Sequence, residues 1–332
     1  MGHGVIVLFL LLLLVHIIFD FYLQTEVMVR EKSFDNGFVR ALKAHLFHAA
    51  MHGFFLCLFC FAFIYGFLSC TNLLNLKLFV FLLILFTLCH FLTDVIKSLT
   101  SLKIKGFYSF FIFLIDQVFH ILTILFVICY FFNDYGVYIY DFDFVKYIGG
   151  MLVFACAIAF LLKPSSIIVY LFFKSSGIGD GSENVKITKS KIAELLYAVL
   201  HKDLGDSNIA DYTLVVSKYK EKAEKIVIGI SNGQADINIS SISKVNNAGR
   251  FIGYLERLII FLFLILGSVT AVVAVLAMKT ALRFSDLKDD NDSGKAEYIM
   301  IGTFFSLIIT VIISMLARMY LIEIGIKIND FS

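Results

Sequence analysis

Long apolar runs separated by short polar segments dominate the chain. Seven of these runs reach the length of about 20 residues that an α-helix needs to cross ~30 Å of hydrocarbon. They cover residues 4–23, 41–68, 76–97, 107–132, 146–173, 252–278 and 297–322. The pattern predicts an all-α membrane protein, a polytopic helical bundle of about seven transmembrane helices.

Pro164 interrupts the fifth run within the sequence Lys163-Pro164-Ser165-Ser166. Proline removes a backbone donor and disfavours helix in the residue before it. We therefore expect the fifth span to end near Leu162 and a short interfacial helix to follow.

One polar segment, residues 175–250, separates the fifth run from the sixth. Its stretch "SKIAELLYAVLHK" has apolar residues at helical spacing, and "KIVIGISNGQADINIS" alternates as a β-hairpin does. We expect a small cytoplasmic α+β domain here, which could bind a cytoplasmic protein partner. The chain then divides into 1–132, a four-helix transmembrane bundle; 133–174, the fifth span and the interfacial helix; 175–250, the α+β domain; and 251–332, two C-terminal transmembrane helices.

Composition and charge narrow the class of protein. The chain is 60% hydrophobic and 16% charged, which excludes a soluble domain, and its net charge of +2 gives no reason to expect nucleic acid. The first run lacks a basic region before it and a small-residue cleavage site, so we expect a retained helix. The Cys57/Cys60 pair has CxxC spacing; lipid-facing thiols are the favoured interpretation, and a redox or metal pair is the alternative.

Lysine and arginine in the short loops predict the orientation. They gather after the first and third runs, whereas the loop after the second run holds only Lys77 and the loop after the fourth is acidic. This predicts a multi-pass protein of the bacterial inner (cytoplasmic) membrane, with the N-terminus outside and residues 175–250 in the cytoplasm. The loop after the sixth run disagrees mildly, because it would lie outside although it holds four lysines and arginines, with four aspartates among them.

Six of the eight histidines lie within the first four runs, where ionisable groups are costly. Three of them pair with an aspartate four residues away, and the other three form a stripe at i, i+3 and i+7, so each set shares one helical face. At ~1.5 Å rise per residue, all lie roughly 5–20 Å from the predicted cytoplasmic boundary. We expect one recessed pocket. The pairs are His16 with Asp20, His90 with Asp94 and His120 with Asp116, and the stripe is His45, His48 and His52.

Imidazole and carboxylate together suit a divalent metal, Zn²⁺ first, and the spread in depth suits one to three ions. Such a site lowers the pKa of bound water and clamps reacting oxygens. The sequence therefore predicts a metal-dependent hydrolase acting on a membrane lipid or lipid-linked ester or phosphodiester, with Asp94 or Asp116 as the general base. Candidates to hold the head group are Gln24, Arg30, Lys32 and Lys97.

Other functions stay open at this point. Histidine and aspartate chains also build proton or cation pathways, and buried polar networks can serve only to fix helix packing. The polar residues at the mouth of the expected pocket could serve only to set the topology, as a basic loop does, without binding a head group. The protein could also be a membrane sensor, and it could be a homo-oligomer. Water access to both membrane faces would favour a transporter, whereas a blind pocket would favour a hydrolase.

Several stretches resemble a bacterial membrane-protein family of unknown function, catalogued as domain-of-unknown-function family 3307. They are "DFYLQTEVMVREK", "HAAMH", "HFLTDVIK", "LIDQVFH", "GRFIGYLERL" and "AEYIMIGTFFS". The family has no established activity, and in residue types it is similar to predicted membrane-bound metal-dependent hydrolases. The resemblance implies that His16, Asp20, His48, His52, His90, Asp94, Asp116 and His120 are motif positions, with His45 an addition.

Overall fold

The computed structural model describes residues 3–67, 76–104, 106–135, 142–176, 248–284 and 293–326. These residues form helices and short connections, contain no β-strand, and belong to one compact unit. Six of their helical segments are long and apolar enough to cross a membrane, so the chain is a multi-pass membrane protein. The α+β domain expected at 175–250 lies outside the described residues except at its two edges.

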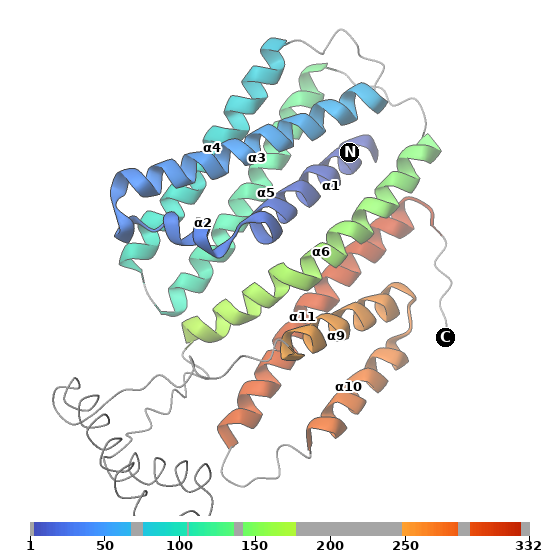
Figure 1. The fold of residues 1–332 in the computed structure, drawn as a ribbon. Helices are drawn as coiled ribbons and strands as arrows, with labels where there is room; N and C mark the ends of the chain where they lie inside the picture. Colours follow the sequence, from blue (N-terminus) through green and yellow to red (C-terminus); the bar gives the residue numbers. More distant parts are fainter. Residues whose placement is uncertain are drawn as a thin grey trace, which may run out of the picture. The chain divides into compact units, whose positions relative to one another are not determined.

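The N-terminal bundle contains the first four spans (Figure 1). Helix α1 packs against α3 and α5, and α4 packs against both α3 and α5. The short elements between α1 and α3 form the connection at one end of the bundle. Their bounds are α1 His3–Ile17, η1 Ile18–Leu23, α2 Glu26–Glu31, η2 Phe34–Asn36, α3 Phe38–Phe67, α4 Leu76–Lys103 and α5 Phe107–Tyr135.

Apolar and polar residues occupy opposite halves of this bundle. Helix α1 up to Val15 and the facing parts of α3, α4 and α5 bury a continuous apolar core that includes Leu8, Leu12, Leu56, Phe86 and Ile124. Because neighbouring helices run antiparallel, the end of α1 and η1 face the first parts of α3 and α5 and the later part of α4. Those are the parts of the helices that carry the histidines and aspartates.

The pair Cys57/Cys60 belongs to the apolar core. Both side chains are at most 2% exposed, so the expectation of lipid-facing thiols is wrong. The face of α3 that carries them meets α4 rather than lipid. Neither cysteine belongs to a group of described side chains that could hold a metal.

Helix α6 (Phe142–Ser176) continues through Pro164, so the predicted end of the fifth span near Leu162 is wrong. Proline cannot donate to the carbonyl of Phe160, and the hydroxyl of Ser165 donates to it instead at 2.8 Å. The Nε group of Arg257, from a distant helix, donates to the carbonyl of Leu161 at 2.5 Å. A helix within a membrane tolerates proline when other groups satisfy the freed carbonyls.

Replacing Arg257 with methionine is expected to destabilise the protein. The guanidinium is 5% exposed and also donates to the hydroxyls of Ser166 at 2.6 Å and Ser306 at 3.2 Å. Its loss removes the buried hydrogen bonds to the carbonyl of Leu161 and to the two hydroxyls, which costs about 2 kcal/mol. Thermal unfolding in detergent measures the effect, and Arg250→Met, at an exposed position, is the control. Equal unfolding temperatures for the two variants would contradict this role of Arg257.

The sixth run, expected as one span over 252–278, is divided into α9 (Ala248–Ile265) and α10 (Val269–Phe284). Gly267 adopts φ 77°, a left-handed conformation that glycine reaches without strain. The amide of Ser268 donates to the carbonyl of Phe263 at 2.9 Å, and that of Gly267 to Leu264 at 3.2 Å. This bonding pattern terminates helices, so α9 stops here. The predicted count of seven spans is not confirmed.

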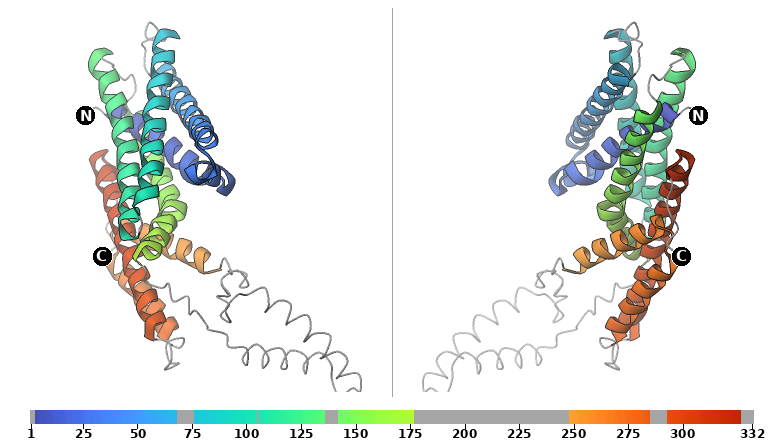
Figure 2. Two further views of the ribbon diagram at one scale, coloured as in Figure 1. Left: turned by 90° about the vertical axis from the view of Figure 1, so that its left-hand side faces the viewer. Right: turned by 90° about the vertical axis from the view of Figure 1, so that its right-hand side faces the viewer.

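Helix α10 turns back along α9, because Lys279 of α10 pairs with Glu256 of α9. Helix α11 (Ser293–Glu323) lies antiparallel to α6, with the rings of Phe305 and Phe172 4.5 Å apart at one end and Tyr320 against Gly149 at the other (Figures 1 and 2). Helix α11 therefore starts at the end of the unit where α6 stops and where α9 begins. The α9–α10 hairpin begins and finishes at that same end.

Candidate metal centre

The four spans of the N-terminal bundle bring all nine predicted histidines and aspartates together. Helix α1 contributes His16, and η1 contributes Asp20. All are buried except Asp20, whose side chain is 9% exposed. Helix α3 contributes His45, His48 and His52, α4 contributes His90 and Asp94, and α5 contributes Asp116 and His120.

Asp20 lies in a π-helical segment that interrupts the end of the first span. The wider turn is marked by the amide of Gln24, which donates to the carbonyl of Phe19 five residues back at 3.2 Å. Short π-helical segments occur frequently at functional sites because they change the direction of a side chain. The apolar run continues from α1 into this segment, so its pattern alone predicts one uninterrupted helix.

Four donor groups surround one point next to Asp20. The side chains of Asp20, His48, His52 and His90 each offer a ligand atom, and these atoms all lie within 4.8 Å of one another. From Oδ1 of Asp20, the Nε2 atoms of the three histidines are 3.1, 2.9 and 3.8 Å away, respectively. Donors bound to one tetrahedral zinc at about 2.0–2.1 Å are separated by roughly 3.3 Å. We call these four side chains the Asp20 group.

A second set of donors adjoins the first. The ligand atoms of His90, Asp94 and His120 also lie within 4.8 Å of one another. Nε2 of His120 is 3.5 Å from Oδ1 of Asp94 and 3.4 Å from Oδ1 of Asp116. His90 belongs to both sets, and its one inward nitrogen can bind only one ion. The Asp20 group, with four donors, is therefore the more complete site.

Several buried polar atoms in this cluster have no hydrogen-bond partner among the described residues. Each such atom costs about 1–3 kcal/mol if nothing satisfies it. Nε2 of His52 is 2.9 Å from the carboxylate of Asp20 but lacks hydrogen-bond alignment with it, as two ligands of one ion would. A cation held by either donor set satisfies Nε2 of His90 together with Nε2 of His52 or of His120, so these residues fit a metal. The atoms are Nε2 of His16, His90 and His120, both ring nitrogens of His52, Nδ1 of His45 and Oδ1 of Asp116.

Two lysines partly neutralise the aspartates. Nζ of Lys32 is 2.6 Å from Oδ2 of Asp94, and Nζ of Lys97 is 2.7 Å from Oδ2 of Asp116. Burial lowers the pKa of Lys32 from its ordinary value, although the carboxylate of Asp94 opposes that shift. With neutral imidazoles, three carboxylates against two ammonium groups leave one negative charge uncompensated, which favours binding of a cation.

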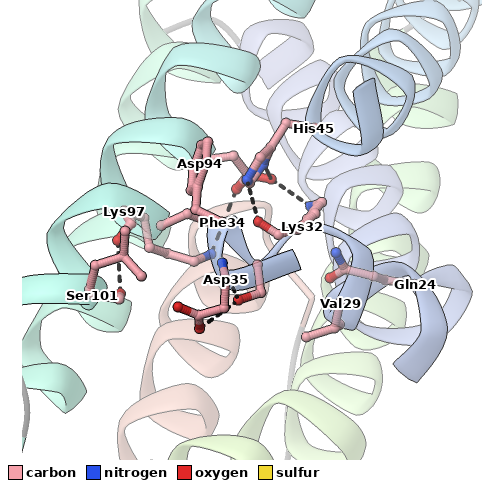
Figure 3. A pocket seen from close by; sticks show the side chains of 12 residues that line it. Gln24, Val29, Lys32, Phe34, Asp35, His45, Asp94, Lys97 and Ser101 are labelled. Atoms are coloured by element: carbon pink, nitrogen blue, oxygen red, sulfur yellow. Dashed lines mark hydrogen bonds and ion pairs between the residues drawn. The ribbon is translucent and has the colours of Figure 1, made fainter. Parts of the chain in front are cut away.

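A pocket of about 290 Å³ lies beside the cluster, between α2, η2, α3 and α4, with Gln24 at its edge (Figure 3). Asp94 and His45 lie at the boundary between the cluster and this pocket. His45 belongs to neither donor set; its Nε2 lies 3.2 Å from the carbonyl oxygen of Lys32. The lining residues are Gln24, Val29, Lys32, Ser33, Phe34, Asp35, His45, Asp94, Lys97, Ser98, Ser101 and Leu102.

Three of the four predicted head-group residues line this pocket, and one does not. Gln24, Lys32 and Lys97 do, whereas Arg30 is exposed and lies outside the lining. Sequence reasoning missed the serines of the pocket. A signal for Ser98 and Ser101 existed, because they follow Asp94 at i+4 and i+7 and so share its face of α4.

Among the described residues, the cluster borders the pocket at one end of the bundle and the apolar core on its other side. On the pocket side, Lys97 is 30% exposed. On the opposite side, the donors meet the apolar core, where Leu12, Phe86 and Ile124 are at most 2% exposed. In the described part of the chain, the pocket therefore lies on one side of the cluster and the apolar core on the other.

Comparison with known proteins identifies the N-terminal bundle. Residues 8–143 match the family model described as a protein of unknown function, DUF3307. No curated protein and no solved structure gives a significant match. The motifs near residues 248 and 296 lie outside the matched range. The matched region includes every histidine and aspartate of the cluster, so the N-terminal bundle is similar to the DUF3307 family, as the N-terminal motifs predict.

Proposed function

We propose that this protein is a metal-dependent hydrolase of a membrane-associated ester or phosphodiester. One observation carries the proposal: among the described residues, buried imidazole and carboxylate atoms without partners gather beside a pocket that Asp94 and His45 line. A metal or proton transporter would need a second opening, and the apolar core between α1, α3, α4 and α5 argues against one. A sensor function would depend on residues 175–250, which lie almost entirely outside the described part of the chain.

The Asp20 group is the proposed ligand set for one divalent ion, Zn²⁺ first. A bound ion supplies an activated water and stabilises charge on the reacting oxygens. Asp94 is the better placed general base, because it lines the pocket whereas Asp116 does not. Asp116 instead holds Lys97 in position at 2.7 Å. Lys32 and Lys97 face the substrate.

We also propose an orientation with the N-terminus outside and the pocket at the cytoplasmic side. Six spans and one hairpin place the start of α11 at the same end as the α2–η2 connection and the end of α6. The lysines and arginines that follow the sixth run, beginning with Lys279, then lie on the same side as Lys32 and Lys43. This arrangement removes the disagreement that the loop after the sixth run presented, because that loop no longer lies outside.

Fluorescent-protein fusions test this orientation. A fusion after Ser176 and a fusion after Phe284 are both expected to fluoresce, because both ends lie in the cytoplasm. A fusion after Ile326 is expected to remain dark. Opposite results at Ser176 and Phe284 would show that the sixth run crosses the membrane once, and would reject the hairpin topology.

Metal removal tests the hydrolase. Purified protein in detergent is treated with a chelator, reloaded with Zn²⁺, and assayed for release of alcohol or phosphate from synthetic lipid esters and phosphodiesters. We expect turnover to fall at least ~100-fold on chelation and to return with the metal. The untreated protein with Zn²⁺ present throughout is the control. Metal-loaded protein that hydrolyses none of these substrates would reject the proposed activity.

A further inference from the structure

We propose that the pocket binds a phosphate group between Lys32 and Lys97, and that phosphate and the divalent ion strengthen each other's binding. This inference rests on the proposed metal centre and names the substrate class: a phosphate-bearing molecule rather than a neutral ester. Phosphate binding and its coupling to the ion can be measured without turnover, so the tests of binding and of hydrolysis are independent.

Two ammonium groups converge on Asp94 from different elements. Lys32 follows α2 and approaches Oδ2 of Asp94 at 2.6 Å, whereas Lys97 lies on α4 and approaches Oδ1 at 3.6 Å. Both lysines line the pocket (Figure 3). A phosphate offers several charged oxygens and can accept from two ammonium groups at once.

The rest of the pocket suits the same ligand. Three hydroxyl groups line it, those of Ser33, Ser98 and Ser101. One further carboxylate, Asp35, lies at the exposed rim, where it accepts from the hydroxyl of Ser33 at 3.0 Å. Val29 and Leu102 add apolar surface to the lining, which an acyl chain or its glycerol end could contact.

Asp94 couples the two sites. In the structure, its negative charge faces Lys32, Lys97 and the inward nitrogens of His90 and His120. A divalent ion held by the Asp20 group brings positive charge near Asp94, because His48 and His90 of that group lie 3.9 Å from its Oδ2, and it offsets part of the negative charge that the lysines face. The lysines then favour an anion in the pocket, and the anion in turn compensates the charge of the ion. Coupling between two ligands is reciprocal, so the ion raises the affinity for phosphate by the same factor by which phosphate raises the affinity for the ion.

Zn²⁺ affinity in dodecyl maltoside micelles, measured by competition with a chromophoric chelator, tests the proposal. Inorganic phosphate is expected to tighten Zn²⁺ binding by roughly tenfold in the wild type, within the usual range of coupling. The double variant Lys32→Met/Lys97→Met is expected to bind Zn²⁺ and to show no such change. Lys103→Met, at an exposed position of α4, should retain the coupling of the wild type.

Separate arms identify the source of the phosphate. Phosphatidic acid and diacylglycerol are added to the micelles in turn. Coupling by phosphatidic acid and not by diacylglycerol supports a lipid phosphate, whereas coupling by inorganic phosphate alone supports a soluble phosphate ligand. Equal coupling by diacylglycerol overturns phosphate recognition.

The outcomes separate this inference from the hydrolase. Zn²⁺ binding that phosphate does not change, or coupling that survives in the double variant, overturns the inference and leaves the metal centre in place. Coupling without turnover of any substrate rejects the hydrolase and leaves the inference in place. Absence of Zn²⁺ binding in the wild type overturns both.

Discussion

Asp20→Asn is expected to lower the zinc content of the purified protein from about one ion per chain to less than about a tenth of that. Asp20 is the carboxylate of the Asp20 group, and the Nε2 atoms of His48 and His52 lie 3.1 and 2.9 Å from it. An amide keeps the size of the side chain but removes the negative charge that the ion would neutralise. Elemental analysis after size-exclusion chromatography measures the content.

Two control variants make the result specific to Asp20. Asp35→Asn is the same chemical change at the rim of the pocket, outside both donor sets, and is expected to leave the zinc content unchanged. His45→Gln removes a buried histidine that belongs to neither set and is expected to do the same. A wild-type zinc content in Asp20→Asn, with the elution profile unchanged, would show that the Asp20 group is not the metal site.

Asp94→Asn is expected to reduce kcat by roughly 10³-fold on a hydrolysed lipid ester or phosphodiester, the range found for the loss of a general base. Asp94 lies where the cluster meets the pocket, next to His90 and His120. The Asp20 group is complete without Asp94, so the variant is expected to retain its zinc. Turnover and zinc content are therefore measured on the same sample.

The variant Asp116→Asn tests whether Asp116 acts as the general base or only positions Lys97. Asp116 does not line the pocket and is bonded to Lys97 at 2.7 Å, so its replacement is expected to raise KM more than it lowers kcat. Glu26→Gln, at an exposed carboxylate of α2, is the neutral control. A greater loss of kcat in Asp116→Asn than in Asp94→Asn would assign the base to Asp116.

The helical character of the first four spans and the shared faces of their ionisable residues were predictable from the sequence. Both depend on local physics: the length of an apolar run decides whether a helix can cross a membrane, and spacing along a helix decides which side chains share a face. The pairs His16/Asp20 and His90/Asp94 illustrate this, since each lies on one inward face. Whether these residues bind metal stays a prediction.

Tertiary contacts decided what spacing could not. Pro164 predicts the end of a helix, but the helix continues, and Arg257, 96 residues away from Leu161, donates to the carbonyl of Leu161 beside the proline. The sixth run reads as one span, but the bonds around Gly267 and the Lys279–Glu256 pair turn it back on itself. Arg30 and Lys32 are equally basic in sequence, and only the lysine lies in the pocket.

The sequence by itself determined that four apolar helices each carry an ionisable face, because hydrophobicity and helical period are properties of neighbouring residues. Only the tertiary structure decided that Asp20, His48, His52 and His90 meet at one point, that His45 belongs to neither donor set, and that an apolar core closes the far side. Those outcomes depend on how helices rotate and pack against one another. That rotation is set by contacts between residues far apart in the chain.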